Sequence, residues 1–256
     1  MAREYLFFWK EQGERSRAGH GTVANCFEEE YYLVQNELYI IICQEAKCIM
    51  KMERKGDNVS GQSRLATVAR TTSETDIAVE LNLDGAGSIE VQTGVGFLDH
   101  MLTLFGVHGF FDLKIQASGD THIDDHHTVE DVGICLGQAL NQALGDRSGI
   151  CRYGTSFVPM DETLVRVSLD LSNRPYLHYE AATPDQKVGS FDTALAKEFM
   201  RALAQHGGMT LHVDLLHGEN SHHIIEAVFK ATARALAAAA ARRDGLQGQL
   251  SSKGML

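Results

Sequence analysis

The pattern His-His-x-x-Glu occurs twice in the chain, as HHTVE at residues 126–130 and as HHIIE at residues 222–226. The second copy opens a strongly helical run over residues 221–241. Side chains three or four positions apart share one face of a helix, so Glu226 can lie beside either histidine of its motif. Adjacent histidines, however, point about 100° apart on a helix. We therefore expect the two histidines of one copy to serve two different metal ions.

The ligand types in these motifs narrow the choice of metal. Neutral imidazole with carboxylate binds Mn, Fe, Zn or Ni, and neither motif contains the thiolates that would single out structural zinc. A single copy would be equally consistent with the solvated start of a helix. Two copies in matched contexts favour a metal site.

Composition limits the class of protein. A chain of 256 residues can hold one large domain or two small ones, and its hydrophobic and charged contents of 44% and 22% are typical of a soluble globular protein. The net charge of -11 argues against a nucleic-acid partner, and no apolar run reaches the length of a membrane span. The five cysteines are odd in number and lack a Cys-x-x-Cys pair, which indicates a reducing compartment. We expect the cytoplasm, or a plastid if the source is a plant or alga.

Residues 1–63 do not share the pattern of the remaining chain. They have no signal-peptide pattern, and their acidic residues fit poorly with an organelle transit peptide. The range from Tyr31 to Cys43 contains a strand-like apolar stretch, but nothing around it suggests a partner strand. We interpret residues 1–63 as an appended or weakly ordered extension without recognisable chemistry.

From residue 64 onward, strand-like and helical patterns follow an order that occurs twice. Residues 100–109 align with residues 198–207, and Glu74-Thr75 aligns with Glu162-Thr163 at the head of a strand. This internal duplication, over about 64–150 and 151–256, predicts an α+β fold of two units, each with helices on one face of a small sheet, packed helix against helix. Such packing would bring the two motifs together in a two-metal site. The expected strands are 66–70, 77–83, 89–92, 110–117, 164–171, 176–180 and 210–216, and the expected helices are 98–108, 126–144, 192–206 and 221–241.

Several longer stretches have a recognisable order along the chain. They are GFLDHM at 96–101, DDHHTVED at 124–131, SHHIIEAVFKA at 221–231, and shorter stretches at 172–176 and 251–254. Together they resemble imidazoleglycerol-phosphate dehydratase. The likeness runs from about Arg70 to Leu256 and implies a repeat of the type seen in the second domain of a small-subunit ribosomal protein. It also implies dehydration of D-erythro-imidazoleglycerol phosphate to imidazoleacetol phosphate in histidine biosynthesis. The family further implies two Mn(II) ions per active site, and trimers that assemble into a 24-subunit shell with active sites shared between subunits.

The resemblance also implies roles for individual residues. One metal-ligand position falls on Glu198, where many relatives have histidine, and a carboxylate can still bind Mn(II). The implied metal ligands are His100, His126, His127, Glu130, Glu198, His222, His223 and Glu226. The implied catalytic residues are Glu74, His100, Glu130 and Glu226. The implied substrate contacts are Glu74, His108, Arg152, Arg174, Lys230, Ser252 and Lys253.

The reaction gives these residues a chemical purpose. The proton to be removed lies beside no carbonyl group, so the electrons must come from the imidazole ring of the substrate. A ring held as imidazolate by metal ions on both nitrogens can expel the hydroxyl group and give a diazafulvene-like intermediate. Glu74 is then the candidate base for the proton, and the two arginines are the candidate phosphate donors. We expect the tail at residues 251–254 to fold over the phosphate.

Two other classes of protein are alternatives. A dinuclear metallohydrolase would use similar histidine and carboxylate clusters with an open metal position. A metal-storage shell of ferritin type would place its ligands on a long four-helix bundle.

Outside the motifs, His206 and His212 lie in or beside apolar segments and are interpreted as structural, and Cys135 as a core residue.

Overall fold

The computed structural model describes residues 29–34, 37–44, 47–51 and 64–253. The chain divides into two compact units, Met1–Gly61 and Gln62–Leu256. In the first unit, β1 (Glu29–Val34), β2 (Glu37–Gln44) and β3 (Lys47–Lys51) form an antiparallel sheet in that order. The expectation of a single strand without a partner within residues 31–43 is therefore wrong. That stretch contains parts of two strands that pair with each other, and the pairing satisfies backbone groups that a lone strand would leave open.

The first half of the second unit contains a four-stranded sheet and two helices. Its elements are β4 (Leu65–Thr71), β5 (Thr75–Asn82), β6 (Ile89–Gln92), α2 (Gly96–Gly109), β7 (Asp112–Gly119) and α3 (His126–Leu144). The strand order is β4-β5-β7-β6, and all neighbours are antiparallel except β6 and β7, which are parallel. Alternation along β5 turns Ile77, Val79 and Leu81 into the core, as expected for a sheet with one covered face.

The second half repeats this arrangement. Its elements are β8 (Tyr153–Met160), β9 (Thr163–Asp170), β10 (Tyr176–Glu180), β11 (Lys187–Val188), β12 (Phe191–Asp192), α4 (Leu195–Gly207), β13 (Thr210–His217) and α5 (Ser221–Ala240). The order of its four-stranded sheet is β8-β9-β13-β10, again with only the last pair parallel. The two sheets share one topology, which is consistent with the predicted duplication. The sequence did not predict β8 or the β11–β12 hairpin, and α4 begins later than expected because Asp192 belongs to β12.

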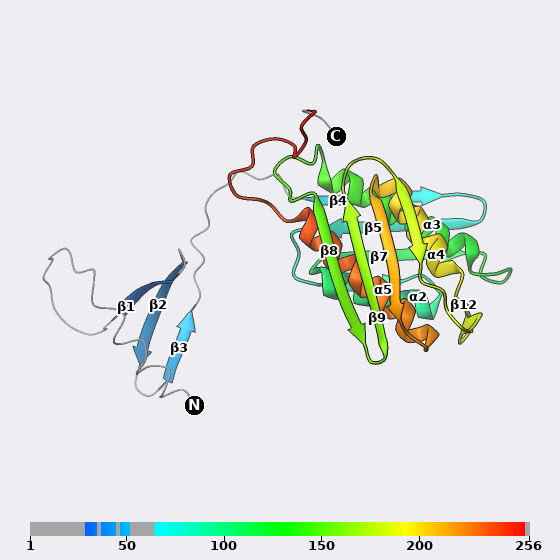
Figure 1. The fold of residues 1–256 in the computed structure, drawn as a ribbon, viewed down its shortest axis with the longest axis horizontal. Helices are drawn as coiled ribbons and strands as arrows, with labels where there is room; N and C mark the ends of the chain where they lie inside the picture. Colours follow the sequence, from blue (N-terminus) through cyan, green and yellow to red (C-terminus); the bar gives the residue numbers. More distant parts are fainter. Residues whose placement is uncertain (1–28, 35–36, 45–46, 52–63, 254–256) are drawn as a thin grey trace, which may run out of the picture. The chain divides into compact units, whose positions relative to one another are not determined.

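The helices of the second unit lie between its two four-stranded sheets (Figure 1). α3 packs on β4 and β5, and α5 packs on β8 and β9. Between the sheets, α3 pairs with α4 and α5 pairs with α2, so each pair joins one helix from each half. This arrangement confirms the predicted α+β fold and excludes the ferritin-type bundle. In the described part of the chain, no helix combines the length and apolar character needed to cross a membrane.

Glycine residues allow α3 and α4 to approach closely. A Cβ atom at Gly133 would lie 2.9 Å from the Cβ of Ala202. A Cβ atom at Gly137 would lie 2.9 Å from both the Gly207 backbone nitrogen and the His206 Cβ. Larger residues at these two positions would push the helices apart. The same contact places His206 at the helix interface, in agreement with its structural interpretation.

Cys135 lies on α3 without solvent exposure, which confirms its interpretation as a core residue. Burial raises the pKa of its thiol to about 11, so both access and thiolate formation are disfavoured. We expect Cys135 to resist iodoacetamide in the folded protein at mildly alkaline pH, whereas the partly exposed Cys151 is alkylated. Peptide mass spectrometry after timed labelling measures both rates in one sample. In urea the two thiols should react alike, and equal rates in the folded protein would contradict the buried position.

Candidate metal centre

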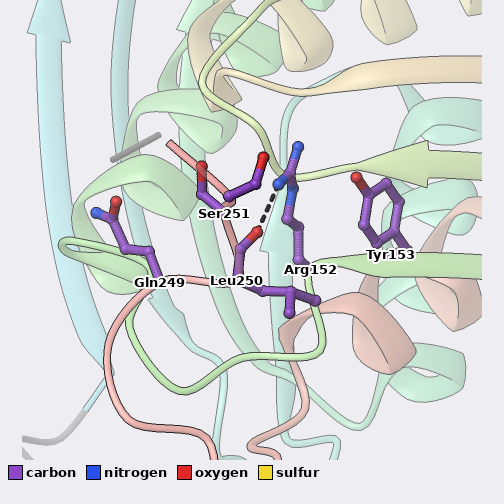
Figure 2. A pocket seen from close by; sticks show the side chains of 6 residues that line it. Arg152, Tyr153, Gln249, Leu250 and Ser251 are labelled. Atoms are coloured by element: carbon purple, nitrogen blue, oxygen red, sulfur yellow. Dashed lines mark hydrogen bonds between the residues drawn. The ribbon is translucent and has the colours of Figure 1, made fainter. Parts of the chain in front are cut away.

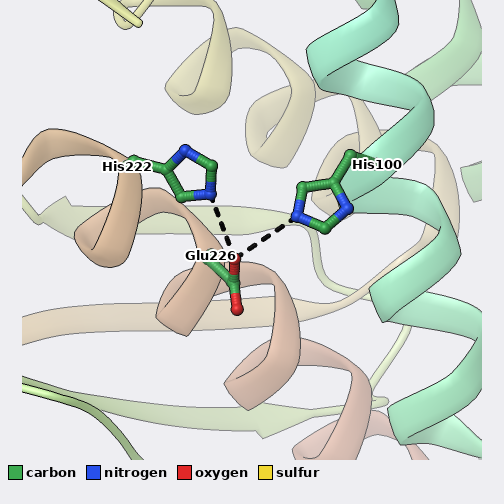
Figure 3. A group of neighbouring side chains, drawn as sticks. All are labelled: His100, His222 and Glu226. Carbon is green, nitrogen blue, oxygen red and sulfur yellow. Dashed lines mark hydrogen bonds and ion pairs between the residues drawn. The ribbon is translucent and has the colours of Figure 1, made fainter.

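Three of the predicted ligands meet where α2 and α5 pack together. His222 Nε2 lies 3.2 Å and His100 Nε2 lies 3.4 Å from the same carboxylate oxygen, Oε2 of Glu226 (Figure 3). The three ligand atoms lie within 4.8 Å of one another, and the described residues contain no other such group of three. Two imidazoles and a carboxylate that face one point are a ligand set for a divalent transition metal.

Helix geometry and capping fix the position of the second motif. The Asn220 side chain accepts hydrogen bonds from the backbone N–H groups of His222 and His223 at the start of α5. This contact satisfies donors that have no partner within the first helical turn. His222 and Glu226 are four residues apart and therefore share the helix face that meets α2.

Glu226 is held as an anion. Its side chain is 8% exposed, and its Oε1 accepts a hydrogen bond from Lys230 Nζ at 2.5 Å. Burial favours a higher pKa, but the hydrogen bonds and charge of Lys230, with the imidazoles of His222 and His100, outweigh it and leave the pKa of Glu226 below its ordinary value. The carboxylate is therefore ready to bind a cation without first losing a proton.

The first motif does not join this cluster. His126 Nε2 lies 3.9 Å from Glu130 Oε2, and their side chains are 45% and 47% exposed. Glu198, which the duplication aligns with His100, forms an ion pair with Arg201 on its own helix. The expectation that both motifs would meet in one site is therefore wrong for the single chain. The reason is the helix pairing, because α3 packs on α4 whereas α5 packs on α2.

The second histidine of each motif has partners of its own. The ring planes of adjacent histidines are 87° apart in the first motif and 80° apart in the second. His127 Nδ1 lies 3.0 Å from Asp120 Oδ2 and 3.9 Å from Glu74 Oε2, and His223 Nδ1 lies 2.8 Å from Glu162 Oε2. The hydrogen bond to Asp120 or Glu162 is the main reason why the pKa of each ring is raised above its ordinary value.

The predicted phosphate contacts gather around Asp170. Arg152 is 7% exposed and donates hydrogen bonds from Nε and one amino group to the two Asp170 oxygens, at 2.7 and 2.9 Å. Its other amino group donates to the Leu250 carbonyl oxygen at 2.6 Å (Figure 2). Arg174 is largely exposed and approaches Asp170 at 3.6 Å. A hollow of about 610 Å³ is lined by Arg152 and by tail residues 249–252, among others.

The remaining predicted substrate contacts lie in three places. Lys230 contacts the cluster by its hydrogen bond to Glu226. His108 lies on the last turn of α2, and its pKa is lowered mainly by burial and also by the positive charge of Lys230. Glu74 precedes β5 and its side chain is half exposed. Ser252 lines the hollow beside Arg152, and Lys253 is exposed in the tail.

The site residues predicted from the sequence did not include Asp120, Glu162 or Asp170. Glu162 had a usable signal, because the duplication aligns it with Glu74. Asp120 and Asp170 follow or end strands without any distinctive spacing to the histidines or arginines. Their roles depend on contacts across the fold.

Comparisons with known proteins identify the family. A family model described as imidazoleglycerol-phosphate dehydratase matches residues 93–236. The protein of that name from Desulfotalea psychrophila is 60% identical over 195 residues, which cover 76% of this chain and 98% of the relative. Its namesake from Acetivibrio thermocellus is 58% identical over 189 residues, covering 74% and 97%.

Solved structures lead to the same family. The Staphylococcus aureus imidazoleglycerol-phosphate dehydratase is 45% identical with a TM-score of 0.64, and the match covers 70% of this chain and 99% of that one. The Pyrococcus furiosus protein is 40% identical with a TM-score of 0.65, and the match covers 74% and 100%. With two duplicated sheets, a ligand cluster between its halves and these relatives, the chain belongs to the imidazoleglycerol-phosphate dehydratase family of hydro-lyases.

Proposed function

We propose that the protein converts D-erythro-imidazoleglycerol phosphate to imidazoleacetol phosphate in histidine biosynthesis, with two Mn(II) ions that stabilise the substrate ring as imidazolate. The observation that carries the proposal is the cluster of His100, His222 and Glu226 in a chain of this family. The ring is the electron source for loss of the hydroxyl group, and Lewis acids on its nitrogens would provide the stabilisation that this loss requires.

The donor atoms of the cluster suit Mn(II), because they combine imidazole nitrogen with anionic oxygen and include no thiolate. The positions that the duplication aligns with this cluster would form a second set of three metal ligands, namely His126, Glu130 and Glu198. We propose that His127 and His223 complete metal sites of neighbouring subunits, in trimers that assemble into a 24-subunit shell. Support comes from the exposed first motif, which forms no three-ligand group with other described residues of its own chain.

Glu74 is the proposed general base. Its backbone is fixed, since the Glu74 N–H donates to Thr72 Oγ1 at 3.1 Å. Its carboxylate is half exposed, and its contact to His127 is long at 3.9 Å. A carboxylate with a fixed backbone and few partners can reach a substrate proton and accept it. Replacing such a base costs a factor on the order of 10²–10⁴ in turnover.

The phosphate would lie at the hollow beside Arg152. Asp170 orients this guanidinium and lies near that of Arg174, and a single guanidinium can contact phosphate through two parallel N–H donors. Ser252 and Lys253 would add a hydroxyl group and an ammonium group from the tail. The tail residue Leu250 already contacts Arg152 through its carbonyl oxygen, which favours closure of the tail over bound phosphate.

We also propose that residues 64–256 form the dehydratase and that residues 1–63 are an appended extension. The division of the chain near residue 61 supports this boundary. The odd number of cysteines, without a Cys-x-x-Cys pair, supports a reducing compartment such as the cytoplasm.

Metal removal tests the proposed function. We expect exhaustive chelation to reduce turnover of imidazoleglycerol phosphate at least about 100-fold, because several kcal/mol of transition-state stabilisation would be lost. Added Mn(II) should restore turnover in the wild type and fail to do so in His223→Ala. Glu198→His, which introduces the residue of many relatives, should retain activity. Undiminished turnover in the chelated enzyme would end the proposal.

A further inference from the structure

The second histidine of each motif, His223 or His127, has a carboxylate within hydrogen-bond distance of its Nδ1 atom. In the second half, His223 Nδ1 lies 2.8 Å from Glu162 Oε2, and in the first half, His127 Nδ1 lies 3.0 Å from Asp120 Oδ2. An ionised carboxylate only accepts hydrogen bonds, so Nδ1 must carry the proton in each pair. A neutral ring in this form has its lone pair on Nε2. Both rings are thus prepared to bind a metal through Nε2, the atom that His100 and His222 also direct at their cluster.

The two halves achieve this with residues from different positions. The duplication aligns Glu162 with Glu74, yet Glu74 lies 3.9 Å from His127, and Asp120 makes the close contact. Asp120 is not the counterpart of Glu162, because it follows β7 whereas Glu162 precedes β9. The duplicated glutamates therefore have different surroundings.

Glu162 is fixed on both oxygens. Its Oε1 accepts hydrogen bonds from the Asn220 and Glu219 backbone N–H groups, at 2.9 and 3.2 Å, and from Thr163 Oγ1 at 3.0 Å. Its Oε2 is then directed at His223. The side chain of the same Asn220 caps α5. Glu162 is therefore hydrogen-bonded to the backbone of the loop that leads into α5.

Asp120 is fixed by its own turn. Its backbone N–H donates to the Glu74 carbonyl oxygen at 3.1 Å, and its carbonyl oxygen accepts from the Ile123 N–H at 2.8 Å. Its side chain is 13% exposed, whereas that of Glu74 is 50% exposed. Among the described residues, the contact with His127 is the sole side-chain interaction of Glu74. The first half thus has a held carboxylate and a second one that is nearly free.

We propose that Glu162 and Asp120 are positioning residues that hold His223 and His127 with an unprotonated Nε2 for metal binding, and that Asp120 performs this task in the first half so that Glu74 remains available for proton transfer. The proposal rests on the proposed function, because it assumes that both histidines are metal ligands. Carboxylates that orient metal-bound histidines typically contribute a factor of about 10–100 in metal affinity.

Three variants of the full chain, each in its native assembly, separate the two roles. Glu162→Gln and Asp120→Asn should each weaken Mn(II) binding about 10–100-fold at the affected ions. Glu74→Gln should bind Mn(II) like the wild type but lose turnover at saturating Mn(II). Glu219→Gln is the matched control, because it changes a charge in the same loop while only its backbone N–H joins the Glu162 network. Titration of free Mn(II) by electron paramagnetic resonance measures binding without reference to activity.

The outcomes decide between the alternatives. If Glu162 and Asp120 have only a structural role, the chelated variants will unfold at lower urea concentration while the Mn(II) affinity per folded subunit stays at the wild-type value, and the proposal is overturned. Equal loss of Mn(II) affinity in Glu74→Gln and Asp120→Asn would overturn the division of roles. Lack of dehydratase turnover in Mn(II)-loaded wild type would instead refute the proposed function, and the binding data would still decide the positioning roles.

Discussion

The variant Glu226→Gln is expected to lose turnover by about 1000-fold or more. Glu226 is the carboxylate shared by His100 and His222, and glutamine would keep its size while removing the negative charge that faces the candidate cation site. Loss of a metal-based Lewis acid costs several kcal/mol in the transition state, which corresponds to roughly three powers of ten in rate. The same change leaves the Lys230 ammonium group without its anionic partner beside the site.

Mn(II) stoichiometry and kcat of Glu226→Gln should be measured together. We expect weakened binding of the ion that this cluster is proposed to hold and a loss of turnover that excess Mn(II) does not fully restore. Glu90→Gln is a suitable control, because Glu90 is exposed and pairs with Lys114 on the surface of the sheet. Wild-type Mn(II) affinity in Glu226→Gln would show that the cluster does not bind the metal.

The variant Gly154→Ala is expected to reduce the free energy of unfolding by about 2–4 kcal/mol. Gly154 lies on β8, and a Cβ atom there would be 1.9 Å from the Ala235 carbonyl oxygen and 3.0 Å from the Ala239 backbone nitrogen. Both contacts are with the backbone of α5, so no side-chain rotation can relieve them. The strand and the helix must separate, and α5 also carries His222 and Glu226.

Urea unfolding at a fixed subunit concentration measures this effect, because assembly makes apparent stability depend on concentration. The control is Gly96→Ala at the start of α2, where a Cβ atom would meet nothing within 4 Å. We expect the control to unfold within about 0.5 kcal/mol of the wild type. If both variants unfold at the same urea concentration, the close approach of β8 to α5 is wrong.

The order of strands and helices was largely predictable from residue 64 onward, because hydrophobic periodicity and the duplication constrain each other. The structure has β6 at the predicted residues, and α3 over His126–Leu144 agrees with the predicted bounds. The sequence did not predict β8, where glycine and proline occur within an edge strand and weaken its pattern. The strands of the β11–β12 hairpin are too short to show an alternation of apolar and polar residues.

The candidate site was less predictable than the fold. Helical spacing was sufficient to place His222 beside Glu226, since that relation lies within one helix. His100 joins them because α2 packs on α5, and the sequence pattern did not specify which helices pair. The same pairing separates the first motif from the cluster. Asp120 and Asp170 act across strands and loops, and no local pattern marks such contacts.

The pairing of α2 with α5 also bears on how this chain could have arisen. His100 comes from one half, and His222 and Glu226 come from the other, so an isolated half lacks a complete set of three ligands. A single-repeat ancestor would have needed a second copy of itself, placed about a two-fold axis, to bind the ion. Fusion of two such repeats would turn an interface between identical molecules into the interior of one polypeptide. After such a fusion the two aligned positions could diverge independently, and positions 100 and 198 now hold His and Glu.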